Sequence, residues 1–216
     1  FERLRYVDGQ EQMELYKGTD CEVSENYVAP ANLVEEFANW SNEELIQIAH
    51  GLGMAPSGVT AGIAGAFGGV TDGLLERGIP RIACADGPSG IRMDNGQMAF
   101  SIANGSLLAA TFNEELNERL FSMLALELRK NGIEVLLGPG MNIHRHPLNG
   151  RNFEYFSEDP LLTGKIAASQ IRGLATYGAV ACPKHFALNN QEFARTEANV
   201  VVSPRAAREI YLKGFE

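Results

Sequence analysis

The sequence of 216 residues predicts an α/β fold, and three observations lead to this prediction. The composition, 45% hydrophobic and 21% charged, is that of an ordinary globular domain. Short apolar runs alternate with longer amphipathic segments, as in parallel βαβ units. Charged and turn residues collect after the apolar runs, where α/β folds place their ligands. Only about four strands are visible in the sequence. A closed eight-stranded barrel takes about 250 residues, so the chain is too short for one. We therefore expect the first half of a (β/α)8 TIM-type barrel, preceded by a polar connector.

The chain divides into two regions by composition. Residues 1–38 are polar and acidic with few periodic apolar positions, which is typical of a connector or of the tail of a preceding module. Residues 39–216 are predicted to form the partial barrel. Because the first residue is Phe1 and not Met, we expect the sequence to be a processed product or a piece, natural or artificial, of something longer.

The second region opens with a helix and a loop. Ser41, with Glu44 three residues later, forms a capping box for a short helix that ends near His50. Residues 51–73 are rich in Gly and Ala and are predicted to be a loop. This stretch lacks the Gly-Lys-Ser/Thr ending of a phosphate-binding loop, so we do not expect it to bind phosphate.

Two strands and a helix are predicted next. Residues 81–85 form a short apolar strand that ends at Asp86, and residues 106–111 form a second strand. Asn113 begins an amphipathic helix, and an Asn-Gly pair stops it after residue 130.

The alternation then repeats. Residues 134–137 are predicted to be a third strand, and residues 140–158 a long polar loop. An Asp-Pro pair at 159–160 starts a helix, with the proline at its first helical position. Residues 179–182 form a fourth strand, and a Ser-Pro pair at 203–204 starts a last helix.

Charge and cysteine content narrow the function classes. The net charge of −9 disfavours nucleic-acid binding, which needs a basic face, and no run approaches the length of a membrane span. The sequence lacks the basic segment followed by an apolar segment that marks a signal peptide. Cys21, Cys84 and Cys182 lie far apart and are predicted to be buried thiols in a reducing compartment, which slightly favours the cytoplasm.

The residues that follow the predicted strands suggest a sugar site. A carboxylate, guanidinium and ammonium groups and an imidazole gathered around one opening can form hydrogen bonds with the several hydroxyls of a polyol. The charge on these groups strengthens each hydrogen bond. Phe153, Tyr155 and Phe156 could supply flat faces for a sugar ring, or they could belong to the core. The charged side chains could also be merely solvated or salt-bridged. The candidate binding residues are Asp86, Arg92, Arg151, Lys184, His185 and Arg195.

Other reactive side chains give weaker signals. His144 and His146 lack a third ligand at suitable spacing, so we expect no metal and no other cofactor. Arg145 between them is expected to form a salt bridge that shapes the loop. Cys182 is predicted to lie inside a strand, where it would be inert, so a Cys-His nucleophile is not expected.

Three linked motifs resemble signatures of glycoside hydrolase family 3. Residues 86–92 (DGPSGIR) are similar to the family's first substrate-binding loop, and residues 138–160 (GPGMNIHRHPLNGRNFEYFSEDP) to its longest signature. Residues 184–186 (KHF), followed by NNQE at 189–192 and by Arg195, resemble its Lys-His segment. The order and spacing agree over about residues 40–216. The third motif lacks the Gly-His-Gly-x-Thr continuation of the N-acetylglucosaminidase branch, so the chain looks like the β-glucosidase branch.

This resemblance implies roles for the candidate residues. Asp86 would bind the outer hydroxyls of the sugar in the −1 subsite, and Arg195 would order the loop beneath it. Glu154 would be structural. The remaining hydroxyls would be bound by Arg92, Arg151, Lys184 and His185.

The family's reaction is a retaining hydrolysis, in which two carboxylates lie about 5–5.5 Å apart. The resemblance implies an Asp nucleophile on a strand beyond Glu216 and a Glu acid/base in a second domain. No catalytic residue is therefore expected in this chain, and we expect the isolated chain to be inactive.

The resemblance also implies partners and leaves alternatives open. The expected partners are a β-glucoside or oligosaccharide substrate, the remainder of the barrel and a second domain, with neither nucleic acid nor membrane. Glucosidases, xylosidases and arabinosidases share these loops, and some members place the second domain before the barrel. The alternatives are a non-catalytic carbohydrate-binding or regulatory fragment, and a structural piece with no function of its own.

Overall fold

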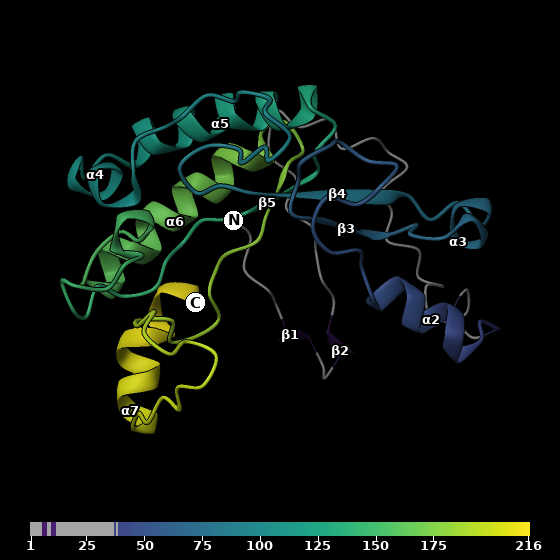
Figure 1. The fold of residues 1–216 in the computed structure, drawn as a ribbon. Helices are drawn as coiled ribbons and strands as arrows, with labels where there is room; N and C mark the ends of the chain where they lie inside the picture. Colours follow the sequence, from purple (N-terminus) through teal and green to yellow (C-terminus); the bar gives the residue numbers. More distant parts are fainter. Residues whose placement is uncertain (1–5, 8–9, 12–36, 38) are drawn as a thin grey trace. The chain divides into compact units, whose positions relative to one another are not determined.

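The computed structural model describes residues 6–7, 10–11, 37 and 39–216 (Figure 1). The chain divides into two compact units, Phe1–Asn39 and Trp40–Glu216. In the first, β1 (Tyr6–Val7) pairs antiparallel with β2 (Gln10–Glu11). Most of the predicted connector over residues 1–38 lies outside the described residues, as does Cys21, so the two-region division stays a prediction.

The second unit is built on a four-stranded mixed sheet in the order β3-β4-β5-β6. The strands are β3 (Gly65–Gly68), β4 (Arg81–Asp86), β5 (Val135–Leu137) and β6 (Val180–Ala181). The β4-β5 and β5-β6 pairs are parallel, and β3 runs antiparallel to β4. The carboxyl ends of β4, β5 and β6 therefore meet at one edge of the sheet.

Helices connect these strands, each beginning at a side-chain cap. α2 (Asn42–Ala49) precedes β3, and α3 (Asp72–Glu76) lies between β3 and β4. α4 (Gly105–Ala110) and α5 (Glu114–Lys130) join β4 to β5, and α6 (Pro160–Ala175) joins β5 to β6. No helix in the described part of the chain is long and apolar enough to cross a membrane.

The core lies where α5 and α6, side by side in Figure 1, pack against the sheet. Apolar side chains of both helices meet the side chains that alternate on one face of β4 and β5. A buried amide pair joins the helices, because Gln170 Nε2 donates to Asn117 Oδ1 at 3.1 Å. The cluster includes Ala83, Ala85, Phe121, Leu124, Leu128, Leu136 and Leu174, all at most 3% exposed.

Several predicted elements are confirmed. The capping box of Ser41 and Glu44 begins α2, Asn113 caps α5, and Asp159 caps α6 with Pro160 in its first turn. These signals act within one helical turn, so the local sequence decides them.

Two predictions about local structure were wrong. Residues 106–111, predicted to be a strand, lie mostly in α4, because Asn104 Oδ1 accepts from the Leu107 backbone N–H at 2.8 Å and starts a helix. A short apolar run does not distinguish a strand from a helix. Residues 51–73, predicted to be a loop, contain β3, and its antiparallel pairing makes the sheet mixed and not all-parallel.

The glycines in that stretch have a packing reason. A Cβ on Gly65 would lie 2.7 Å from the carbonyl oxygen of Leu52, so only glycine lets these backbones approach. Gly68 has a φ of +78°, a conformation that side chains of L-residues rarely adopt.

The last helix begins at the predicted Ser-Pro pair but soon changes character. α7 (Pro204–Ala206) continues as a π-helical segment (Ala207–Tyr211) and then a 3-10 turn (Lys213–Phe215). The 3-10 turn packs against α6, where Phe215 contacts a second, smaller core cluster around Ile166.

Candidate functional site

The candidate site starts at the carboxyl ends of β4 and β6. Asp86 is the last residue of β4, and Lys184 lies shortly after β6. The backbone after β5 holds Lys184 in place, because its N–H donates to the Pro139 carbonyl at 2.9 Å and its carbonyl accepts from Met141 at 2.7 Å. The side chains of Asp86 and Lys184 are therefore presented at the same edge of the sheet.

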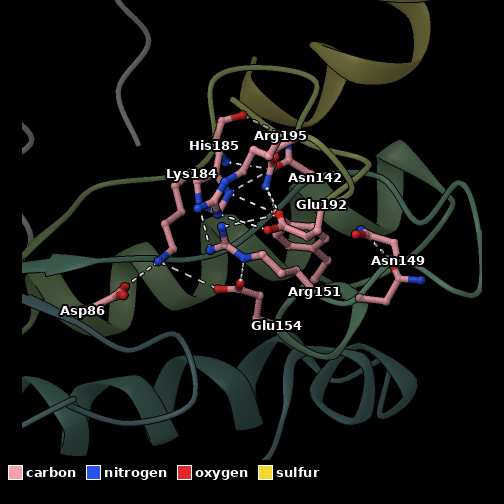
Figure 2. A network of polar contacts seen from close by, with 12 residues as sticks. Asp86, Asn142, Asn149, Arg151, Glu154, Lys184, His185, Glu192 and Arg195 are labelled. Carbon is pink, nitrogen blue, oxygen red and sulfur yellow. Dashed lines mark hydrogen bonds and ion pairs between the residues drawn. The ribbon is translucent and has the colours of Figure 1, made fainter. Parts of the chain in front are cut away.

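A chain of ion pairs links these strand ends to the loop after β5 (Figure 2). Lys184 Nζ lies 2.5 Å from Asp86 Oδ1 and 3.8 Å from Glu154 Oε2. Arg151 Nε donates to Glu154 Oε1, and Arg151 Nη1 lies 3.7 Å from Glu192 Oε1. The Glu154 side chain is only 6% exposed, so its charge is balanced by two cations and not by water.

His185 completes this network as a neutral imidazole. Its Nε2 lies 2.8 Å from Arg151 Nη2, and its Nδ1 lies 3.0 Å from Tyr155 Oη and 3.2 Å from Asn142 Oδ1. Burial, followed by the positive charges of Arg151 and Lys184, lowers the pKa of His185 to about 4. The ring is therefore uncharged at neutral pH.

A second layer of contacts supports the network from the loop after β6. Asn189 Nδ2 donates to Tyr155 Oη at 2.8 Å and to Glu192 Oε1 at 3.0 Å. Arg195 Nη1 donates to Glu192 Oε2 at 3.0 Å, so Arg195 joins through this carboxylate. Burial raises the pKa of Tyr155 to about 12, and the phenol keeps its proton.

Five of the six candidate binding residues thus lie in one network, and Arg92 is the exception. Its side chain is 60% exposed, and its Nε donates to Asp94 Oδ1 at 2.9 Å. The Asp94 hydrogen bond and charge raise the pKa of Arg92, and the Asp86 charge adds a smaller effect.

The three aromatic residues separate by burial. Tyr155 and Phe156 are 0% and 5% exposed and belong to the interior, whereas Phe153 is 54% exposed. Cys84 is buried as predicted, and burial raises the pKa of its thiol to about 11. Cys182 is exposed, contrary to the prediction, because it follows the strand at the edge of the described sheet.

The histidine pair in the long loop serves backbone contacts. His144 Nε2 lies 2.8 Å from the Asn152 carbonyl oxygen, and His146 Nδ1 accepts from the Leu148 N–H at 3.1 Å. Within the described residues, no group of three or more His, Cys, Asp or Glu could hold a metal ion. Arg145 makes no ion pair with another described residue, contrary to the prediction; it lines two cavities of about 340 Å³ each.

Residue patterns alone did not point to several members of the network, although the family resemblance had already implied a structural role for Glu154. Glu154 and Glu192 each lie three positions from an arginine of the site, and that spacing could have suggested the ion pairs. Asn142 gave no local signal, because it lies 43 positions from His185. The assembled network offers a carboxylate acceptor, ammonium and guanidinium donors and a neutral imidazole, which suits a ligand rich in hydroxyls.

Comparison with known proteins agrees with this chemistry. The model of the glycosyl hydrolase family 3 N-terminal domain matches residues 73–216. The chain belongs to glycoside hydrolase family 3. It is 56% identical over 186 residues to a β-glucosidase of Ruminococcus albus, and 42% identical over 186 residues to β-glucosidase A of Butyrivibrio fibrisolvens. These matches cover 86% and 85% of the chain, but the chain spans only 20% and 21% of these relatives.

Solved structures of family members share the fold. A β-glucosidase from Paenibacillus barengoltzii is similar with a TM-score of 0.82 and 56% identity, over 85% of this chain and 20% of that one. β-Glucosidase 3B from Thermotoga neapolitana, in complex with α-D-glucose, gives a TM-score of 0.76 and 40% identity, over 84% of this chain and 27% of that one.

Proposed function

We propose that this family 3 chain is the N-terminal part of the catalytic barrel of a β-glucosidase. It would supply residues of the −1 subsite for the retaining hydrolysis of terminal β-glucosides. The observation that carries the proposal is the ion-pair network at the strand ends, in which Lys184 joins Asp86 to Glu154. Relatives named β-glucosidases, at up to 56% identity among those described above, support it.

In this proposal Asp86, Lys184 and Arg151 bind sugar hydroxyls, whereas the buried Glu154 holds the two cations in place. Asp86, 33% exposed, can accept hydrogen bonds from two hydroxyls, and Lys184 and Arg151 can donate to others. The ion pairs hold these groups in place before the sugar arrives, so little reorganisation is needed when it binds.

The catalytic pair is proposed to lie outside these 216 residues. Asp86 and Glu154 both face Lys184, and Glu154 also accepts from Arg151. Carboxylates held by cations in this way are unsuited to the reaction, which needs one carboxylate free to attack and another that carries a proton. We propose an Asp nucleophile on a later strand of the same barrel and a Glu acid/base in a second domain.

The test compares the full-length protein with the isolated chain on p-nitrophenyl β-D-glucoside. We expect turnover only by the full-length protein. In that protein, Asp86→Asn should lower kcat/KM by about 10- to 100-fold, because hydrogen bonds to charged groups contribute about 1.5–3 kcal/mol. The control is Asp72→Asn, an exposed carboxylate in α3, which should leave kcat/KM unchanged.

Other outcomes would change the proposal in defined ways. Turnover by the isolated chain would show that the nucleophile lies within these 216 residues, contrary to the proposal. An Asp86→Asn protein as active as the wild type would remove Asp86 from the sugar site. If the full-length protein cleaves only the matching xyloside or arabinoside, the family holds but the glucosidase assignment fails.

A further inference from the structure

The side chain of Asn142 is an unusual neighbour for His185, because it contacts both the backbone and the ring of that residue. Asn142 is 2% exposed. Its Nδ2 donates to the His185 carbonyl at 2.9 Å, and its Oδ1 accepts from the His185 N–H at 2.8 Å. These two bonds fix which end of the amide is oxygen, since a flipped amide would set donor against donor and acceptor against acceptor.

The contacts of the His185 ring determine where its proton lies. Arg151 has only donors, so the short contact at His185 Nε2 is a hydrogen bond only if that nitrogen carries a lone pair. A neutral imidazole then carries its proton on Nδ1. The Nδ1 proton has two oxygen neighbours, Asn142 Oδ1 at 3.2 Å and Tyr155 Oη at 3.0 Å. Asn142 Oδ1 can only accept, and its orientation is already set by the backbone.

We propose that Asn142 is a positioning residue, an inference that rests on the proposed function. Its amide oxygen holds His185 as the neutral tautomer protonated on Nδ1, so that Nε2 accepts from Arg151 and fixes the guanidinium for a sugar hydroxyl. Arg151 is then restrained at each of its three nitrogens: Nε by Glu154, Nη1 by Glu192 and Nη2 by His185.

Protonation of His185 would undo this arrangement. A second ring proton on Nε2 would face the Nη2 donor of Arg151, and two cations would be in contact. Burial and the cations oppose this protonation, whereas the two carboxylates favour it. The charged and titratable groups that face the ring are Arg151, Glu154, Tyr155, Lys184 and Glu192.

The test replaces Asn142 with its charged isostere, Asn142→Asp, in the full-length protein. A carboxylate in contact with Nδ1 should raise the pKa of His185 by about 1–3 units. The readout is the midpoint of thermal unfolding as a function of pH, which requires no substrate. The same substitution in a His185→Gln background is the matched control.

The sign of the expected effect follows from linkage. In the wild type, the folded pKa of His185 is about 4 and the ordinary value is 6.5, so stability from this group is lost as the pH falls from 6.5 to 4. In the Asn142→Asp protein the folded pKa of His185 is higher, so less stability is lost as the pH falls. The destabilisation caused by Asn142→Asp should therefore be greatest above pH 7 and smaller at pH 5. In the His185→Gln background only the introduced carboxylate titrates, so the pH dependence of the cost should differ between the two backgrounds by the contribution of His185.

Each outcome decides the proposal. An equal loss of stability at every pH would make Asn142 merely structural, and so would a cost with the same pH dependence whether or not His185 is present. If Asn142→Asp does not fold, Tyr155→Phe answers the same question. We expect it to leave the pH dependence unchanged, and a shift would assign the Nδ1 proton to Tyr155. A protein that shows the expected pH effect but cleaves no glycoside would refute the proposed function and leave standing only the positioning of His185 and Arg151 by Asn142.

Discussion

Glu154 shows how one buried residue organises the candidate site. Its two oxygens face Arg151 and Lys184, and its side chain is 6% exposed. A buried carboxylate is stable only while cations or hydrogen bonds replace its lost hydration. Removing the Glu154 carboxylate would in turn leave Arg151 and Lys184 with fewer partners in a low-dielectric environment.

Replacing Glu154 should therefore destabilise the fold. We expect Glu154→Gln to lower the free energy of unfolding by about 3 kcal/mol, since breaking one side of a buried ion pair leaves charge uncompensated. The comparison is Glu209→Gln, in an exposed pair with Arg205, which should cost about 0.5 kcal/mol or less. Urea denaturation of the full-length proteins measures both, and equal effects would mean that water already screens Glu154.

At the scale of elements, the contact between α5 and α6 sets the position of the loops that carry the site. Gln170 bonds Asn117, and Arg172 Nε donates to Glu118 Oε2 at 2.7 Å across the same interface. Gly173 allows the helices to touch, because a Cβ there would lie 2.3 Å from the Glu118 carbonyl oxygen. Backbone atoms cannot move aside as a flexible side chain can.

Two glycines of α6 give a matched test of this packing. Gly173→Ala should destabilise the protein by about 1–3 kcal/mol, the usual range for overpacking a close contact. Gly164→Ala, on the same helix, would place its Cβ 3.4 Å from the nearest atom and should stabilise by up to about 1 kcal/mol through helix propensity. Thermal unfolding separates the two, and a Gly173→Ala protein as stable as the wild type would show that the helices can shift apart.

On the scale of the whole molecule, β6 lies at the edge of the described sheet. Val180 on that strand is 56% exposed, and an unpaired strand edge is a template for another strand. In the proposed full-length enzyme, the next strand of the barrel would cover this edge.

The isolated chain should therefore self-associate through β6. We expect oligomers by light scattering, and Val180→Lys should reduce them because an edge lysine opposes strand pairing. Val201→Lys serves as the control, since Val201 is 87% exposed but lies outside the sheet. A monomeric isolated chain would contradict the expectation, as would a Val201→Lys effect equal to that of Val180→Lys.

The sequence by itself determined the features that depend on near neighbours. The caps at Ser41, Asn113 and Asp159 act within one turn, so their helices begin where predicted. The strand that ends at Asp86 and the later Lys-His pair were likewise visible as apolar runs followed by charge. Because parallel strands end at a common edge, these features also predicted that Asp86 and Lys184 would lie at the same edge of the sheet, but they did not place Arg151 and Arg195, which join the network from loops.

Only the tertiary structure decided the features that depend on distant partners. β3 exists because it pairs with β4, and residues 106–111 lie mostly in a helix because a cap and packing outweigh an ambiguous apolar run. Lys184 meets Asp86 across 98 positions, and Asn142 meets His185 across 43. The energy of such contacts comes from burial and charge brought together by folding, and no local pattern encodes it.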